Sequence, residues 1–193
     1  AEGIRYTHAF ATSPVCAPSR SCFMLGMYQT TTDTPHMRSH RSDDFKLPPG
    51  IRPLTHRLKD AGYFTANITH LGTEEMGTGK LDLNFVNEGE LYDSHQWDEL
   101  KSHQPFFAQI NLPEAEYDIY DRKSADKPRV PWVGEEWHPQ VATEENVTPP
   151  PYYPDHPISR QEWARYLNSV SGADIRVGKI LARLKADGMD DDT

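Results

Sequence analysis

The chain has 193 residues, of which 29 are acidic and 20 are lysine or arginine, so its formal net charge is −9. An acidic chain is a poor candidate for binding nucleic acid, because cationic side chains supply most of the affinity for a phosphate backbone. No apolar run approaches the roughly 20 residues that a membrane-spanning helix needs. We therefore expect neither nucleic acid nor a membrane among its partners, and the 16 prolines predict long loops between ordered elements.

The first predicted elements are a strand end over residues 6–11 and a short helix over residues 19–28. The strand end contains aromatic residues and runs into a Thr-Ser-Pro turn. The helix is indicated by a short apolar segment, and Pro18 stands just before it, where a missing backbone N–H does no harm to a helix start. Residues 30–44 are polar and are expected to form a loop.

Three further elements are predicted in the middle of the chain. Residues 53–62 suit a short helix that starts at a proline and ends at a glycine. Residues 63–69 suit a strand because they carry β-preferring side chains. Residues 106–112 form a compact apolar run, which is typical of a buried strand in a parallel sheet. Residues 117–157 are rich in proline and lack periodicity, which predicts a long surface loop.

A long helix is predicted over residues 159–187, ending at Gly188. Ser159 and Glu162 fit a capping box at its start. Apolar residues recur at helical spacing and predict one buried face. They are Trp163, Tyr166, Leu167, Val170, Ala173, Val177, Ile180, Leu181 and Leu184. Helices that alternate with strands in this way indicate an α/β layered fold.

The most informative segment is residues 14–20, Pro-Val-Cys-Ala-Pro-Ser-Arg. Cys16 and Cys22 are the two cysteines of the sequence, too few for a disulfide framework or a cysteine-based zinc site. A tyrosine-phosphatase loop needs a longer spacing from cysteine to arginine, with glycines around the phosphate. Arg20 follows Cys16 by four residues with no glycine between them, so that interpretation fails. An ordinary buried cysteine remains the alternative to a reactive one.

The pattern Cys-x-Pro-Ser-Arg over residues 16–20 resembles the motif by which sulfatases are recognised. The similarity continues in residues 23–28, Phe-Met-Leu-Gly-Met-Tyr, although Leu25 stands where the family usually has threonine. Weaker similarity follows in three more segments, residues 36–40, 151–155 and 177–181. The chain therefore resembles the formylglycine-dependent sulfatases over most of its length.

This resemblance implies an α/β fold of the alkaline-phosphatase-like type, with a mixed sheet flanked by helices. Family members begin with a strand that ends in paired metal-binding aspartates, and they carry an Asp-His or Asp-Asn metal pair after a long helix. Neither pair is found at the corresponding places of residues 1–193. We therefore expect a partial sulfatase catalytic domain that lacks the N-terminal metal-ligand strand and the C-terminal portion, and that need not be active alone.

The activity that the resemblance implies is hydrolysis of sulfate esters in a small molecule or a polysaccharide. Cys16 would be oxidised to formylglycine by a formylglycine-generating enzyme and then hydrated to a diol. One diol hydroxyl attacks the sulfur and expels the alcohol, and the other then collapses to the aldehyde and releases sulfate. Cys16 would also be a metal ligand, with calcium or another divalent cation on the sulfate oxygens. The resemblance further implies a periplasmic or secreted protein.

Arg20 and Lys80 complete the site that the resemblance implies. Arg20 would hold the oxygens of the nucleophile at a helix N-terminus, where the helix dipole favours anions. Lys80 lies in a Gly-Lys segment whose lysine contacts the sulfate in the family. The proton donor to the leaving group stays open, because Asp82 and Glu116 stand where the family has histidines.

Other interpretations also remain open. His36 and His40 are alternative proton donors, although for each of them the role of an ordinary loop residue is favoured over a catalytic one. A second hypothesis is a non-catalytic or truncated relative that binds a partner or a sugar through aromatic loop residues, Trp132, Trp137, Tyr152 and Tyr153. A phosphoesterase of the same superfold is disfavoured, because such enzymes place serine or threonine at the nucleophile and lack the Cys-x-Pro-Ser-Arg pattern.

Overall fold

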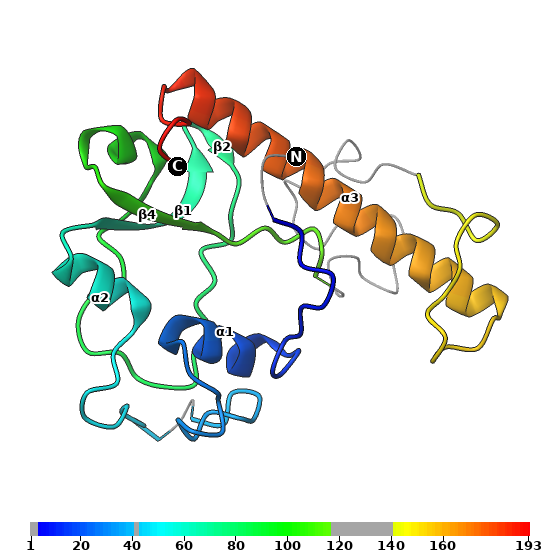
Figure 1. Cartoon of the computed structure of the whole chain (residues 1–193), viewed down its shortest axis with the longest axis horizontal. Coiled ribbons are helices and arrows are strands. Elements are labelled where there is room, and N and C mark those ends of the chain that lie inside the picture. The colour runs from blue at the N-terminus through cyan, green and yellow to red at the C-terminus, as the bar shows by residue number, and fades with distance from the viewer. Residues whose placement is uncertain (1–3, 41–42, 117–140) are drawn as a thin grey trace. The chain divides into compact units, whose positions relative to one another are not determined.

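The computed structural model describes residues 4–40, 43–116 and 141–193 (Figure 1). The chain divides into two compact units. The first unit comprises residues 1–66, 80–94 and 103–108, and the second comprises residues 67–79, 95–102 and 109–193. In the part of the chain that the structure describes, no helix has the length and apolar character needed to cross a membrane.

Helices and a four-stranded sheet make up the ordered elements, which confirms the predicted α/β class. The strands are β1 (Phe64–Leu71), β2 (Glu74–Glu75), β3 (Ser94–Gln96) and β4 (Phe106–Ile110). Their order is β2-β1-β3, and β4 also pairs with β1. Strands β1 and β2 are antiparallel, with His70 opposite Glu75 and Leu71 opposite Glu74.

The two central strand predictions are confirmed in position, but one is wrong about burial. β1 begins one residue later and ends two residues later than predicted, and β4 ends two residues earlier than predicted. All five residues of β4 are half-buried, whereas the apolar run predicted a fully buried strand. Apolar composition therefore located the strand but did not determine how much of it is covered.

The helices of the first unit are α1 (Cys16–Leu25) and α2 (Leu54–Asp60), followed along the chain by a 3-10 helix, Trp97–Ser102, in the second unit. Helix α1 begins three residues earlier than predicted, at Cys16, with Val15 in extended conformation before it. Helix α2 is confirmed, with Pro53 as its N-cap residue. The strand end predicted over residues 6–11 is wrong: this segment is exposed and pairs with no strand, and aromatic residues favour a strand only where one can pack.

The core of the first unit fixes α1 against a distant segment of the chain. Its buried members come from α1 and from residues 85–92, and they are Met24, Leu25, Phe85, Leu91 and Tyr92. Phe45, Leu54 and Phe107 are among the half-buried side chains that pack against them. Because burial of a large apolar side chain contributes about 1.5–3 kcal/mol, this cluster is sufficient to hold the helix and the segment after Lys80 together.

The second unit contains α3 (Pro157–Ala186), the longest helix. The predicted capping box is wrong: His156 is the N-cap, and its Nδ1 accepts a hydrogen bond from the Ile158 N–H at 3.2 Å. Ser159 lies inside the first turn instead, because the helix already begins at Pro157. Proline at the first helical position needs no N–H partner, so the helix can begin at Pro157, two residues earlier than predicted.

The predicted buried face of α3 is only partly correct, because one of its nine residues is buried and four are half-buried. Four of the expected core residues are at least 39% exposed: Tyr166, Val170, Val177 and Leu181. The buried residues are mainly small or polar: Ala164, Asn168, Ser169, Gly172, Arg176 and Leu184. Asn168 accepts hydrogen bonds from the N–H groups of Val141 and Ala142, so its burial is compensated.

The last predicted element, the loop over residues 117–157, is described only in part. Residues 141–156 contain neither helix nor strand, as expected for a loop. Trp132 and Trp137, two of the aromatic residues of the binding hypothesis, lie outside the described residues. Tyr152 and Tyr153 are exposed, and their rings lie 5.2 Å apart between centroids.

Candidate functional site

Cys16 is the first residue of α1 and therefore lies at the end of the helix where backbone N–H groups lack intrahelical partners. The helix start is well formed, since the Ser19 N–H donates to the Val15 carbonyl at 3.1 Å. No acidic residue occupies the first turn, so the positive end of the helix dipole is not offset there. Cys16 is half-buried and forms no disulfide with Cys22. This position favours an anion at the side chain of residue 16.

Lys80 and Arg20 meet Cys16 at this helix end. The Lys80 ammonium Nζ lies 3.4 Å from Cys16 Sγ. Arg20, one turn further along α1, donates from Nη1 to the Lys80 backbone carbonyl at 3.0 Å. The structure thus brings together all three residues that the sequence indicated for catalysis, with the arginine holding the backbone of the lysine.

Asp82 belongs to the same cluster, because its carboxylate lies beside the cations of Arg38 and Lys80. Its side chain is 4% exposed and accepts hydrogen bonds from Arg38 Nε at 3.1 Å and Nη2 at 3.2 Å. The Lys80 ammonium lies 3.9 Å from Asp82 Oδ2. Sequence reasoning noted Asp82 as a departure from the family and missed Arg38. The signal available for Arg38 was its place in residues 36–40, one of the segments that resemble sulfatases.

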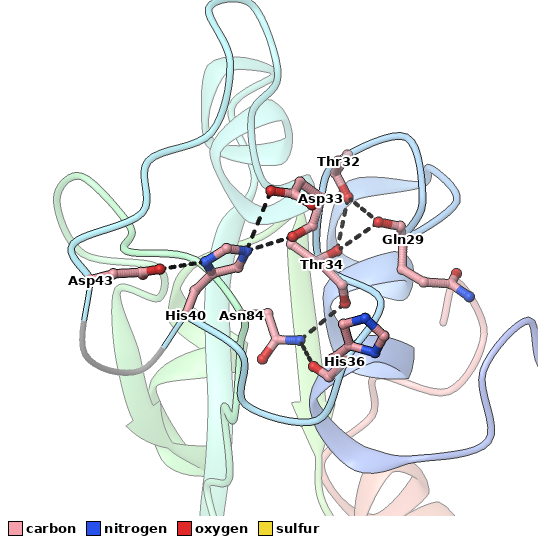
Figure 2. A network of polar contacts seen from close by, with 8 residues as sticks. All are labelled: Gln29, Thr32, Asp33, Thr34, His36, His40, Asp43 and Asn84. Carbon is pink, nitrogen blue, oxygen red and sulfur yellow. Dashed lines mark hydrogen bonds and ion pairs between the residues drawn. The ribbon is translucent and has the colours of Figure 1, made fainter.

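The loop that carries Arg38 is held by buried polar contacts (Figure 2). Asn84 Nδ2 donates to the carbonyls of Thr34 at 3.0 Å and His36 at 2.5 Å. The Asn84 N–H donates to the Ser21 hydroxyl of α1 at 2.9 Å, which connects the same residue to the helix that begins at Cys16. Asn84 therefore links the loop before Arg38 to α1.

His40 fixes the other side of this loop, as Figure 2 shows. Its Nε2 lies 2.6 Å from the Asp33 carbonyl oxygen, and its Nδ1 lies 2.8 Å from the Asp43 carboxylate. Its ring stacks on Phe45 with the ring centroids 4.0 Å apart. The hydrogen bond with Asp43 raises the pKa of His40 above its usual value. These contacts favour a role for His40 in holding the loop over its predicted alternative as a proton donor.

The remaining candidates for the proton donor are His36 and Glu116, and the structure shows the following contacts for them. The His36 carbonyl takes part in the loop contact with Asn84. Glu116 belongs to the second unit, is exposed, and donates its backbone N–H to the Pro113 carbonyl at 3.0 Å. The assignment of the proton donor stays a prediction.

The cluster that Cys16 forms with Arg20, Arg38, Lys80 and Asp82 carries more cations than carboxylates, in contrast to the acidic chain as a whole. Arg20, Arg38 and Lys80 contribute three cations, and Asp82 contributes one carboxylate. Burial raises the pKa of Tyr92 to about 12, and the charge of Arg20 lowers it only in part, so this phenol is neutral at physiological pH. A local cationic field of this kind attracts an oxyanion even when the overall net charge is negative.

The described residues do not form a metal site by themselves. They contain no group of three or more histidine, cysteine, aspartate or glutamate side chains that could hold a metal ion. Asp82, the carboxylate of this site, is paired with Arg38 and Lys80. A calcium ion at Cys16 would therefore need most of its ligands from outside the described residues.

Comparison with known proteins gives a consistent result. The model of the Sulfatase family matches residues 1–193. The chain is 25% identical over its whole length to the ulvan-active sulfatase of Formosa agariphila, of which it covers 36%. It is 34% identical over 101 residues to the uncharacterized sulfatase YidJ of Escherichia coli, covering 48% of this chain and 19% of that protein. It is 35% identical over 74 residues to arylsulfatase J of Mus musculus, covering 37% of this chain and 12% of that protein. This chain belongs to the sulfatase family.

Proposed function

We propose that this chain supplies the nucleophile-bearing part of a hydrolase for sulfate esters of carbohydrates. The observation that carries the proposal is the contact between the Lys80 ammonium and Cys16 Sγ at the N-terminus of α1. The relative matched over the whole chain is named for activity on ulvan, which supports a carbohydrate as the substrate class. A periplasmic or secreted location and calcium as the divalent cation follow from the family and belong to the same proposal.

In this mechanism the side chain at position 16 carries the reacting oxygen. Conversion of Cys16 to formylglycine by a maturation enzyme would supply a hydrated aldehyde as the nucleophile and a route for releasing sulfate. The N–H groups of the first turn of α1 and the Lys80 ammonium then stabilise negative charge on the sulfate oxygens. Arg20 keeps Lys80 at this place by binding its carbonyl and adds a further positive charge.

The experiment that tests the proposal is maturation of the full-length protein with a formylglycine-generating enzyme. We expect mass spectrometry to find the Cys16 thiol converted to the aldehyde and the protein to release sulfate from sulfated oligosaccharides. Cys16→Ala should abolish sulfate release. Cys22→Ala is the matched control, because Cys22 lies on the same helix and its thiol accepts a hydrogen bond from the nearby Thr12 hydroxyl at 3.3 Å. An unmodified thiol at Cys16 despite the maturation enzyme would contradict the mechanism.

A second candidate function is sugar binding without hydrolysis. It is supported by the exposed pair Tyr152 and Tyr153, with 78% and 54% of their surfaces exposed, because aromatic faces can stack on sugar rings. In the same assay this function would appear as binding of the sulfated oligosaccharide with no sulfate released. Loss of that binding in Tyr152→Ala together with Tyr153→Ala would support it.

A further inference from the structure

Asp82 is a nearly buried carboxylate that stands two residues after Lys80. A buried carboxylate is strongly unfavourable unless cations or hydrogen bonds compensate it. Arg38 binds it with two nitrogens, and Lys80 approaches its second oxygen. Asp82 thus lies between a guanidinium and the ammonium that contacts Cys16.

The pairing between Arg38 and Asp82 fixes the orientation of the carboxylate. Two parallel N–H···O bonds from one guanidinium set both the position and the plane of a carboxylate, which a single lysine contact cannot do. Both residues also have positive φ angles, 57° for Arg38 and 47° for Asp82. Residues with a Cβ adopt this conformation at an energetic cost, and it persists where the surrounding structure requires it.

Contacts of the loop around Arg38 hold its backbone in this conformation. Asn84 binds the carbonyl two residues before Arg38, and His40, two residues after it, is held by Asp33 and Asp43 (Figure 2). The backbone that carries Arg38 is therefore anchored on both sides. Its guanidinium can act as a fixed support for Asp82.

Lys80 is correspondingly held at two places. Arg20 binds its carbonyl at 3.0 Å, and its ammonium lies between Cys16 Sγ at 3.4 Å and Asp82 Oδ2 at 3.9 Å. A lysine side chain has four rotatable bonds and loses considerable entropy when it is fixed. An oriented carboxylate beside the ammonium selects the rotamer that reaches Cys16.

We propose that Asp82, held by Arg38, is a positioning residue that keeps the Lys80 ammonium at Cys16 for binding of the sulfate group. This role rests on the proposed sulfatase function and extends it to two residues that the family pattern does not assign. In this chain the Arg38–Asp82 pair orients the lysine side chain.

The affinity for inorganic sulfate distinguishes a positioning role of Asp82 from a purely electrostatic one. If Asp82 only added negative charge near the anion, Asp82→Asn would tighten sulfate binding. If it positions Lys80, the same change weakens sulfate binding by about tenfold, although a negative charge is removed. The measurement is isothermal titration of the full-length protein carrying the Cys16 thiol, so it does not depend on maturation.

A double-mutant cycle with Lys80→Met gives the second readout. Because Asp82 acts through Lys80, Asp82→Asn should have almost no further effect on sulfate affinity, or on kcat/KM of the matured protein, once Lys80 is methionine. Asp82→Glu should restore part of the affinity and confirm that the carboxylate itself is required. Glu88→Gln is the matched control, because it removes the carboxylate of an exposed pair with Lys46 in the same unit.

Tighter sulfate binding in Asp82→Asn, or equal losses with and without Lys80, would overturn the positioning role while leaving the proposed function intact. A wild-type protein that binds no sulfate and releases none after maturation would instead overturn the proposed function and this role with it. Thermal denaturation of each variant identifies one that fails to fold, in which case Arg38→Lys, expected to weaken sulfate binding less than Asp82→Asn, takes its place in the cycle.

Discussion

Two arginine–carboxylate pairs, one in each unit, show how surroundings give the same chemistry different roles. In the second unit, the Arg176 and Glu114 side chains are 1% and 0% exposed and are in direct contact. Arg176 also donates to the carbonyls of Glu75 at 3.3 Å and Met76 at 3.2 Å. In the first unit, Arg38 is 42% exposed and its partner Asp82 also faces Lys80. The first pair joins α3 to residues 75, 76 and 114, whereas the second lies beside a candidate nucleophile.

This difference indicates which pair stabilises the fold and which adjusts a site. A charge sealed among protein atoms has no water to replace a lost partner, so its removal acts on folding. A half-exposed cation can be solvated when its partner is removed, so its main effect is on the local field and geometry. Three changes test the contrast, from the largest expected effect to the smallest.

The largest effect is expected from Arg176→Met. The change leaves the Glu114 carboxylate buried without its cation, and breaking a buried pair in this way costs about 3–5 kcal/mol of the free energy of unfolding. Urea denaturation of the full-length protein measures it. Lys179→Met is the matched control on the same helix, because Lys179 forms a 2.9 Å pair with Glu74 in which both side chains are about half exposed. Equal losses for the two variants would remove the contrast between buried and exposed pairs.

Lys80→Met should show the opposite pattern, with a large effect on catalysis and a small one on folding. Loss of a cation that stabilises transition-state charge typically lowers kcat by about 100- to 1,000-fold, or about 2.7–4 kcal/mol. Steady-state kinetics of the matured protein on a sulfated oligosaccharide measures this. Lys46→Met, which removes an exposed lysine of the same unit, serves as the control. If Lys80→Met lowers the unfolding free energy as much as Arg176→Met does, the group at Cys16 is structural.

The start of α1 shows what local sequence could and could not predict. Pro18 correctly indicated a nearby helix start, but it occupies the third helical position, not the position before the helix. Proline is tolerated there because the N–H groups of the first turn lack intrahelical partners. The correct start places Cys16 within the first turn. Cys16 was therefore predicted as the candidate nucleophile from the motif, and its position in the helix came from the structure.

Long-range polar contacts account for most of what the sequence could not predict. The apolar periodicity of residues 159–187 indicated a helix correctly, yet its buried face is set by Asn168 and Arg176, whose partners are 26 or more residues away. Arg38 was missed as a site residue for the same reason, because Asp82 is 44 residues further along. A pattern read along one segment carries no information on which distant carboxylate will meet a given cation.

The smallest expected effect concerns His40, which supports Arg38 without contacting the site. Because the hydrogen bond with Asp43 raises the pKa of His40 in the folded state, charged His40 stabilises the fold. That contribution is fully present below the unfolded pKa of about 6.5 and is lost as the pH rises through the higher folded pKa. His40→Gln should therefore destabilise the protein more at acidic than at alkaline pH, as measured by urea denaturation across this range. Asp43→Asn should weaken the same pH dependence, because it removes the hydrogen bond that is the main cause of the raised pKa, while Asp33 remains beside His40. If the destabilisation by His40→Gln instead grows with rising pH, His40 acts in its neutral form. The loop that carries Arg38 would then be held by the stacking of His40 on Phe45 and not by the charge of His40.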